Sequence, residues 1–369
     1  MMRRVMVVTG TRAEFGLLRS TMTAIDSHPR LDLVVVAAGA HLLPPARTIE
    51  EVAAAFDVEA EVVMQVSGET GRVADAVAFG RGVSGFAGVI DRVRPDFVVV
   101  LGDRIEAFAA ASAAAIAGVA VVHLHGGDRA EGVADEAMRH AISQLADVHF
   151  PATSKSGERL VRMGQPPDSV HVVGSPAVDD LAGFPPLTDE RWSDLGDPGV
   201  VVLQHGSGLE DEMEAAWANA VLDAAREHGP VLVLEPNHDP GSGIVRESIA
   251  KRVEAGLVQS RLHLPRPEFI GLLRRVDAVV GNSSAGLIEA AIVGCPAVNV
   301  GPRQGGRERP RSVIDVERAD QGGILEAIRR AASMDREIDH PYGTPGVGGR
   351  IASSLAGQPL PTPRKRLAH

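Results

Sequence analysis

Short, continuous apolar runs recur along the chain, and Ala-rich segments of helical pattern separate most of them. The runs are Val5–Val8, Leu33–Ala37, Phe97–Leu101, Val119–Val122, Val170–Val173, Val200–Leu203, Val231–Leu234, Ala278–Val280 and Ala297–Val300. Continuous apolar runs predict strands that are buried on both faces, and their alternation with helices predicts parallel sheets. We therefore expect about six strands before residue 175 and about five after residue 199.

A Pro-, Gly- and Asp-rich stretch interrupts this pattern and marks a domain boundary. The prediction is an α/β fold with two Rossmann-like domains, residues 1–175 and 199–345, joined by a linker at 176–198. Residues 346–369 are expected to form a C-terminal helix and a flexible tail. The cleft between the domains is the default ligand site, and loops that follow the carboxyl ends of strands should line it.

Composition narrows the possible partners. The 369 residues include 37 Lys and Arg against 48 Asp and Glu, which gives a net charge of −11. This acidity argues against binding to nucleic acid or to an anionic membrane, whereas a few arginines can still bind a small anion. Cys295 is the only cysteine, which excludes an internal disulfide and fits a cytoplasmic protein. The apolar run within Met1–Gly10 is shorter than that of a signal peptide, and the apolar stretch Ala107–Val122 is too short to span a membrane.

Two loops of the first domain follow predicted strands. Thr9–Gly16 is a Gly-bearing turn that leads into a helix, so it can bind an anion with the help of Arg12. The turn matches no dinucleotide or Walker motif, and an ordinary tight turn is the alternative. Asp103 and Arg104 follow Phe97–Leu101 and should face the cleft, where Arg104 is a candidate for substrate binding. Asp103 can act as a general base or bind a sugar hydroxyl; alternatively it only caps the next helix.

The segment 123–140 is unusually rich in ionisable side chains. A His-x-His pair in a strand points to opposite faces, so we expect no metal ion on His123 and His125. Asp135 and Arg139 have the spacing of a simple helical ion pair, which is the alternative to a role in catalysis. The candidate catalytic side chains of this segment are Asp128, Glu131, Asp135 and Arg139, and His125 is a candidate for substrate binding.

The second domain offers candidates for nucleotide binding. His205 follows Val200–Leu203 and should face the cleft, where a catalytic or phosphate-binding role is favoured. Asn237 lies in a turn that either contacts a base or ribose or is a plain Pro/Asp turn. The strongest phosphate signal is Gly281–Glu289, because serine hydroxyls at a helix start can bind a diphosphate. The candidates here are Ser283 and Ser284 for the diphosphate, Glu289 for the ribose, and Arg303 and Arg307 for neutralising the anion.

Six motifs occur together in one order: Gly10–Glu14, Gly102–Arg104, His123–Gly127, Asp135–His140, Gly281–Ser284 and Arg303–Arg307. In this set the chain resembles the hydrolysing UDP-N-acetylglucosamine 2-epimerases, over nearly its whole length up to about Asp315. The resemblance implies a glycosyltransferase-B-like fold with UDP mostly on the second domain. It also implies a reaction that gives UDP and free N-acetylmannosamine, without a redox cofactor. We further expect a homo-oligomer, either a dimer or a tetramer.

The implied reaction eliminates the C2 proton and UDP to give a 2-acetamidoglucal, to which water then adds with inversion at C2. The resemblance assigns acidic and basic site residues to Asp103, Asp135 and Arg139, and a second-domain histidine to His205. It assigns nucleotide contacts to Ser283, Ser284, Glu289 and Arg303.

Departures from the family pattern leave three points open. Asp128 stands where close relatives of the family carry Glu, and His125 stands where more distant relatives carry Glu. The base that removes the C2 proton can therefore be Asp103, Asp128, Glu131 or Asp135. The sugar is N-acetylglucosamine or a 2,4-diacetamido-trideoxy sugar, with His41 as the expected polar group near carbon 4. A non-hydrolysing epimerase, a glycosyltransferase and a nucleotide-sugar sensor are the alternative functions.

Overall fold

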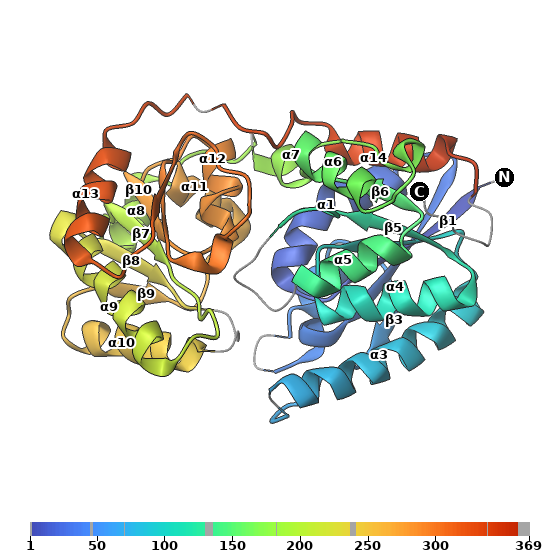
Figure 1. Ribbon diagram of the computed structural model, residues 1–369, viewed down its shortest axis with the longest axis horizontal. Helices are drawn as coiled ribbons and strands as arrows, with labels where there is room; N and C mark the ends of the chain where they lie inside the picture. Colours follow the sequence, from blue (N-terminus) through green and yellow to red (C-terminus); the bar gives the residue numbers. More distant parts are fainter. Residues whose placement is uncertain are drawn as a thin grey trace. The chain divides into compact units, whose positions relative to one another are not determined.

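The computed structural model describes residues 2–44, 47–69, 71–129, 136–181, 183–236, 241–337 and 339–360. They form two units, each with a parallel six-stranded sheet flanked by helices (Figure 1). Among the described residues, the first unit comprises those up to Asp128, those from Glu136 to Asp179 and those from Tyr342 onward. The second unit comprises Arg129 and the described residues from Asp180 to Pro341.

The first sheet has the strand order β3-β2-β1-β4-β5-β6. Its strands are β1 (Arg3–Thr9), β2 (Leu31–Ala38), β3 (Val58–Val62), β4 (Phe97–Leu101), β5 (Ala120–Leu124) and β6 (Val148–Phe150). Successive residues of β1 point to opposite faces, with Val5 and Val7 in one core cluster and Met6 and Val8 in the other. The chain reverses its winding direction between β1 and β4, where a doubly wound sheet opens a crevice at its carboxyl edge.

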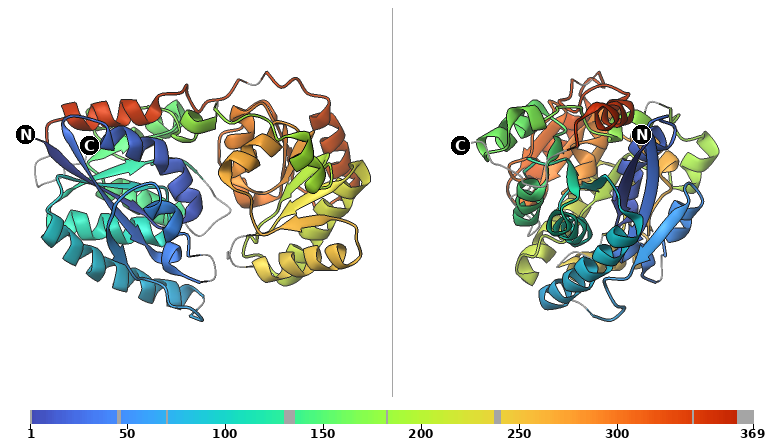
Figure 2. Two further views of the ribbon diagram at one scale, coloured as in Figure 1. Left: turned by 180° about the vertical axis from the view of Figure 1, so that it is seen from behind. Right: turned by 90° about the vertical axis from the view of Figure 1, so that its right-hand side faces the viewer.

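Helices cover both faces of this sheet. α1 (Arg12–Asp26) and α14 (Val347–Gly357) pack on one face, side by side (Figure 2, left), and α3 (Arg72–Val93), α4 (Ile105–Ala117) and α5 (Glu136–Leu145) pack on the other. α1 and α14 can approach closely because Gly348 of α14 has no side chain. A Cβ at this position would lie 2.5 Å from the Ser20 carbonyl oxygen of α1. The remaining helices are η1 (Gly39–Leu42), α2 (Ile49–Ala53), α6 (Ser154–Arg162), η2 (Pro167–Ser169) and α7 (Ala177–Leu181).

Among the described helices, only α3 is long and apolar enough to span a membrane, judged by length and composition alone. Phe86, Val89 and Ile90 of α3 are buried in the core cluster that this helix forms with α4 and the sheet. Core helices pass the same test, so the apolar character of α3 is weak evidence for a membrane span.

The second sheet repeats this topology with the strand order β12-β11-β10-β7-β8-β9. Its strands are β7 (Val200–Leu203), β8 (Val231–Leu234), β9 (Gln259–Arg261), β10 (Ala278–Gly281), β11 (Ala297–Val300) and β12 (Val313–Val316). Its helices are α8 (Asp189–Asp194), α9 (Asp211–His228), α10 (Ser242–Glu254), α11 (Arg266–Leu273), η3 (Ser284–Gly286), α12 (Glu289–Ile292), η4 (Pro302–Gln304) and α13 (Gln321–Ala332). The winding reverses between β7 and β10, and doubly wound sheets commonly bind ligands at the carboxyl ends of the strands at such a switch point.

The predicted α/β fold with two Rossmann-like sheets is confirmed, but one predicted strand is wrong. Val170–Val173 forms only an isolated bridge from Val170 to His149, and the edge position belongs to β6. The strands that the apolar pattern missed, β3, β6, β9 and β12, are the four edge strands. An edge strand is covered less completely than a central one, so it needs no continuous apolar run; β9, for example, is Gln-Ser-Arg.

Two segments outside the predicted domain limits contribute to the cores. Leu181 and Leu195, in the stretch expected to be a linker, are buried in a core cluster of the second unit. Val347 and Ile351, in the expected C-terminal helix, are buried in the first unit. Residues 361–369 of the expected tail lie outside the described residues.

Candidate functional site

The carboxyl groups of Glu14 and Glu106 are buried beside the turn that follows β1. Thr11 caps α1 by accepting from the Glu14 N–H at 3.3 Å, and the Glu14 carboxyl group accepts a hydrogen bond from the Gly10 N–H at 2.7 Å. Burial raises the pKa of Glu14 to about 8, so this side chain is protonated at neutral pH. Glu106 leaves no room for a side chain at position 10, because a Cβ there would lie 2.6 Å from the Glu106 Cβ.

Arg12, expected to bind an anion, and Arg104, expected to bind the substrate, each have an acidic neighbour. Arg12 Nε lies 3.1 Å from the Glu51 carboxylate, and Arg104 Nε lies 3.4 Å from Glu106 Oε2. Both arginines are at the carboxyl edge of the first sheet, beside the switch point between β1 and β4. Their roles in substrate binding stay predictions.

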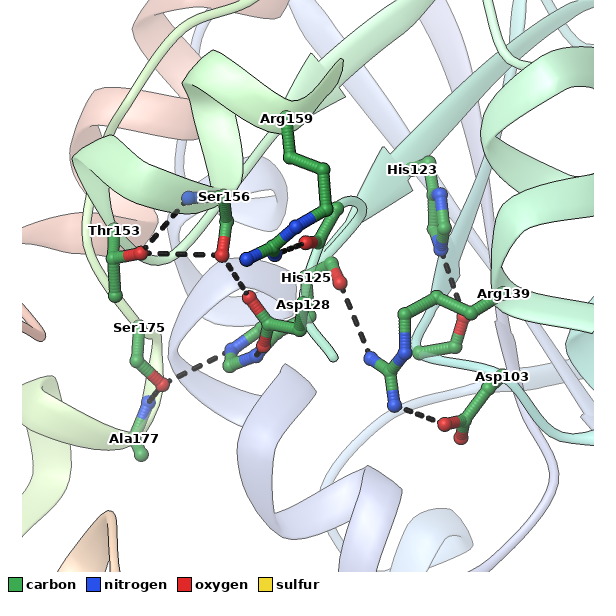
Figure 3. Close-up of polar contacts among 12 residues, drawn as sticks. Asp103, His123, His125, Asp128, Arg139, Thr153, Ser156, Arg159, Ser175 and Ala177 are labelled. Atoms are coloured by element: carbon green, nitrogen blue, oxygen red, sulfur yellow. Dashed lines mark hydrogen bonds and ion pairs between the residues drawn. The ribbon is translucent and has the colours of Figure 1, made fainter. Parts of the chain in front are cut away.

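Asp103 follows β4 and forms an ion pair with Arg139 of α5 (Figure 3). Arg139 is buried, and its Nη1 also donates to the His125 carbonyl oxygen at 3.2 Å. The residue that caps α4 is Arg104, so the alternative in which Asp103 serves only as the helix cap is wrong. The structure thus brings Asp103, Arg139 and His125 together beyond the carboxyl ends of β4 and β5.

His123 lies within β5 and is a structural residue. Its Nε2 is 2.8 Å from the Gly102 carbonyl oxygen, and its Nδ1 is 3.1 Å from Ser143 Oγ. Burial lowers the pKa of His123 to about 3, so the ring is neutral at neutral pH. The ring ties α5 to the residue before Asp103 and therefore helps to hold both members of the Asp103–Arg139 pair.

His125 lies after β5, in a turn with a φ of 60°, so the expectation that both histidines lie in one strand is wrong. Its Nδ1 is 3.0 Å from Asp128 Oδ2, and its Nε2 is 3.0 Å from Ser175 Oγ (Figure 3). Ser156 Oγ donates to Asp128 Oδ1 at 2.7 Å. The predicted candidates His125 and Asp128 are therefore in direct contact, and Ser156 and Ser175 are partners that the sequence did not indicate.

His41 cannot be the polar group near carbon 4 of the sugar, as we had expected. It is fully buried, with Nε2 3.0 Å from Thr9 Oγ1 and Nδ1 2.7 Å from Thr48 Oγ1. Burial lowers the pKa of His41 to about 4, so it is a neutral ring that fixes the end of β1.

Three predicted site residues, Glu131, Asp135 and Asn237, lie outside the described residues. The proposed pairing of Asp135 with Arg139 is therefore not described, and the partner seen for Arg139 is Asp103. The roles of these three residues stay predictions.

In the second unit, Asn282 fixes the position of His205. Asn282 Oδ1 accepts from the His205 N–H at 2.7 Å, and Nδ2 donates to the His205 carbonyl oxygen at 2.8 Å. This double contact joins the carboxyl ends of β7 and β10, the two strands at the switch point. On the other side, the Asn282 carbonyl oxygen accepts from Arg303 Nη1 at 3.2 Å and Gln304 Nε2 at 2.8 Å. His205 and Arg303 are thus held through one residue that we had not singled out.

The loop 283–289 forms η3 and then α12, in place of the single helix expected from its sequence. Ser283 caps η3 by accepting from the Ala285 N–H at 3.3 Å. The amides of Ser283 and Ser284 donate no hydrogen bond within the part of the chain that the structure describes. Glu289 Oε1 lies 3.8 Å from Arg266 Nη1, and half-buried Arg307 follows η4. These two amides, together with Arg303 beside Asn282, suit an anionic ligand.

Glu214 of α9 supports the loop after β7 and had not been predicted. It is fully buried, and its Oε1 accepts from the Ser207 N–H at 2.6 Å and the Leu209 N–H at 3.1 Å. No local sequence signal distinguishes this glutamate from the exposed acidic residues around it on α9.

Comparisons with known proteins were made for the whole chain. Residues 23–356 match the family model described as UDP-N-acetylglucosamine 2-epimerase. The UDP-N,N'-diacetylbacillosamine 2-epimerase (hydrolyzing) of Legionella pneumophila is 34% identical over 369 residues, covering 98% of this chain and 97% of the relative. The UDP-N-acetylglucosamine 2-epimerase of Neisseria meningitidis is 30% identical over 355 residues, covering 92% of this chain and 91% of the relative.

A solved structure gives the same fold. The UDP-GlcNAc 2-epimerase of Methanocaldococcus jannaschii, in complex with UDP-GlcNAc and UDP, matches with a TM-score of 0.80 at 17% identity. The match covers 95% of this chain and 99% of that chain. At this identity the likeness establishes the architecture alone.

Proposed function

Because the chain belongs to the UDP-N-acetylglucosamine 2-epimerase family, we propose that it is a hydrolysing epimerase that converts UDP-N-acetylglucosamine and water into UDP and free N-acetylmannosamine. The observation that carries this proposal is the group formed by Asp103, Arg139, His125 and Asp128 beyond the carboxyl ends of β4 and β5. It supplies carboxylates for proton transfer and a buried cation beside them.

In the proposed reaction, a carboxylate removes the proton from sugar C2 while the C1–O bond breaks and its electron pair leaves with UDP. The product of this elimination is a 2-acetamidoglucal. Water then adds across the C1=C2 bond, with hydroxyl at C1 and a proton delivered to the opposite face of C2. We propose that the carboxylates come from Asp103, Asp128, Glu131 and Asp135, with Arg139 and His205 assisting. The reaction needs no redox cofactor, since no net oxidation occurs.

We propose that the second unit binds UDP, and that two substitutions there weaken the affinity for UDP. Ser284→Ala removes a hydroxyl proposed to contact the diphosphate, and Glu289→Ala removes the proposed acceptor of ribose hydroxyls. Each loss is expected to cost about 1.5–3 kcal/mol, or roughly tenfold or more in the dissociation constant. Titration calorimetry with UDP measures this change.

The matched control for the UDP experiment is Glu268→Ala. Glu268 is a carboxylate of α11 that pairs with Arg191 at 2.8 Å, so its removal should leave UDP affinity unchanged. Unchanged affinity in both Ser284→Ala and Glu289→Ala would place the nucleotide elsewhere.

A second candidate substrate is the UDP-linked 2,4-diacetamido-2,4,6-trideoxy sugar. The relative named for UDP-N,N'-diacetylbacillosamine is 34% identical, against 30% for the relative named for UDP-N-acetylglucosamine. The burial of His41 also removes the polar group that we had expected near a free 4-hydroxyl. A site that leaves a polar group unpaired with the wrong sugar discriminates strongly, so turnover of the two substrates side by side should differ by a large ratio.

An NMR time course with each UDP-sugar tests the proposed function. Free UDP together with the free 2-epimerised sugar is the expected result. A UDP-linked 2-epimer would assign the protein to the non-hydrolysing type, and transfer of the sugar to an acceptor would assign it to the glycosyltransferases. A preference for the diacetamido sugar would change the substrate and leave the elimination chemistry in place.

A further inference from the structure

Ser175 lies 50 positions from His125 in the sequence and contacts it in the fold. We propose that Ser175 is a positioning residue of the reaction, which acts through His125 to hold the Asp128 carboxylate in one orientation. This inference rests on the proposed function, in which Asp128 is one of the proton-transferring carboxylates. The claim concerns Ser175 and does not require Ser175 to touch the substrate.

The contacts form one continuous series of hydrogen bonds (Figure 3). Ser175 Oγ is 3.0 Å from His125 Nε2, and His125 Nδ1 is 3.0 Å from Asp128 Oδ2. Asp128 Oδ1 accepts from Ser156 Oγ at 2.7 Å, and Thr153 Oγ1 donates to Ser156 Oγ at 3.1 Å. Each carboxylate oxygen of Asp128 therefore has a partner, and the two partners come from different elements, the turn after β5 and α6.

The series has the order Ser-His-Asp found in nucleophilic hydrolases, but its geometry fits a different role. Ser175 is fully buried, and its Oγ also accepts a hydrogen bond from the Ala177 N–H at 3.3 Å. The Ser175 N–H donates to the Tyr342 carbonyl oxygen at 2.9 Å, which fixes the backbone as well. A buried and doubly anchored hydroxyl cannot attack a substrate, whereas it can fix the ring of the histidine that it contacts.

Asp128 sets the position of the ring proton of His125, and Ser175 holds the ring in the orientation that directs Nδ1 to Asp128. An ionised carboxylate only accepts hydrogen bonds, so His125 must carry its proton on Nδ1 to bind Asp128. Nε2 then accepts from the Ser175 hydroxyl when the ring is neutral, and donates to it when the ring is charged. Both ring nitrogens stay paired in either state. Without Ser175 Oγ, Nε2 loses its partner and the ring can rotate away from Asp128.

His125 also connects Asp128 to the other carboxylate of the group. Its carbonyl oxygen accepts from Arg139 Nη1 at 3.2 Å, and Arg139 pairs with Asp103. The φ of 60° at His125 is costly for a residue with a side chain, so this turn needs contacts that hold it. The side-chain contacts with Ser175 and Asp128 and the backbone contact with Arg139 meet this requirement.

Two readouts on the full-length protein test the role of Ser175. In ¹⁵N NMR of the histidine rings, we expect a hydrogen-bonded Nδ1–H signal that His125→Gln removes and thereby assigns. Ser175→Ala should weaken or abolish this signal, and Ser175→Thr should retain it because the hydroxyl is kept. With the UDP-sugar, Ser175→Ala should lower kcat about tenfold or more while KM and UDP affinity change less than about twofold.

Ser20→Ala is the matched control for a purely structural anchor. Ser20 Oγ donates to the Pro176 carbonyl oxygen at 3.4 Å, so it anchors the same segment without touching His125. The proposal is wrong if Ser175→Ala and Ser20→Ala lower kcat equally, or if the His125 signal is the same in both. If the wild-type protein converts no UDP-sugar, the proposed function fails by itself, and the His125 signal still decides whether Ser175 orients the ring.

Discussion

Asp103→Asn is expected to lower turnover of the UDP-sugar by about two orders of magnitude or more, while UDP still binds with its normal affinity. Asparagine has the size of aspartate but cannot take up a proton at neutral pH. The substitution also leaves the buried Arg139 without its anionic partner, which removes the arrangement that we propose for proton transfer. Turnover is measured by the release of UDP, and UDP affinity by calorimetry.

Asp96→Asn is the control for this experiment. Asp96 precedes β4 and accepts from the Arg4 N–H at 2.8 Å, at the end of the strand opposite to Asp103. We expect this variant to keep normal turnover. A thermal melt of Asp103→Asn shows whether its fold is retained. Near-normal turnover in folded Asp103→Asn protein would show that Asp103 takes no part in the acid–base chemistry. Loss of the folded state would show that its ion pair with Arg139 stabilises the fold.

Ile351→Ala is expected to lower the free energy of unfolding of the first unit by about 2–5 kcal/mol, measured by urea denaturation. Ile351 is fully buried in α14 and packs in the core cluster that also contains Val5, Val7 and Leu18. Removing its side chain beyond Cβ leaves a cavity between α14 and the sheet. Hydrogen exchange should show lower protection for the amides of β1 and β2.

Ile328→Ala provides the corresponding change in the second unit. Ile328 is fully buried on α13, in a core cluster with Val200 and Val280. We expect it to lower protection in β7 and β10 and to leave β1 and β2 protected. If Ile351→Ala lowers protection in β7 and β10 as much as in β1 and β2, then α14 stabilises both units and not the first alone.

The sequence predicted the central strands and missed the edges for a physical reason. β1, β4, β7 and β10 are buried on both faces, so their apolar runs identify them without tertiary information. An edge strand such as β9 is polar, and only its pairing with β8 defines it.

The same limit applies to the candidate site. Asp103 and His205 were predicted because they follow apolar strands, where parallel sheets place ligands, and His125 because it lies in a segment rich in ionisable side chains. Ser175 and Asn282 were not, since their partners His125 and His205 are 50 and 77 positions away. Distant pairing has no signature in a single sequence. His41 shows the opposite error, because a polar residue in a predicted loop is paired and buried.

The return of the chain to the first unit has a consequence for the order of folding during synthesis. All of the second unit precedes α14 in the chain, whereas the first unit needs Val347, Ile351 and Leu355 of α14 to complete its core. Domains usually fold in the order in which they leave the ribosome. Here the second unit can reach its native state while the first still lacks a helix. The nascent first unit therefore exposes the apolar residues that α14 covers, including those of α1, until that helix emerges, and this is the stage at which chaperones would bind it.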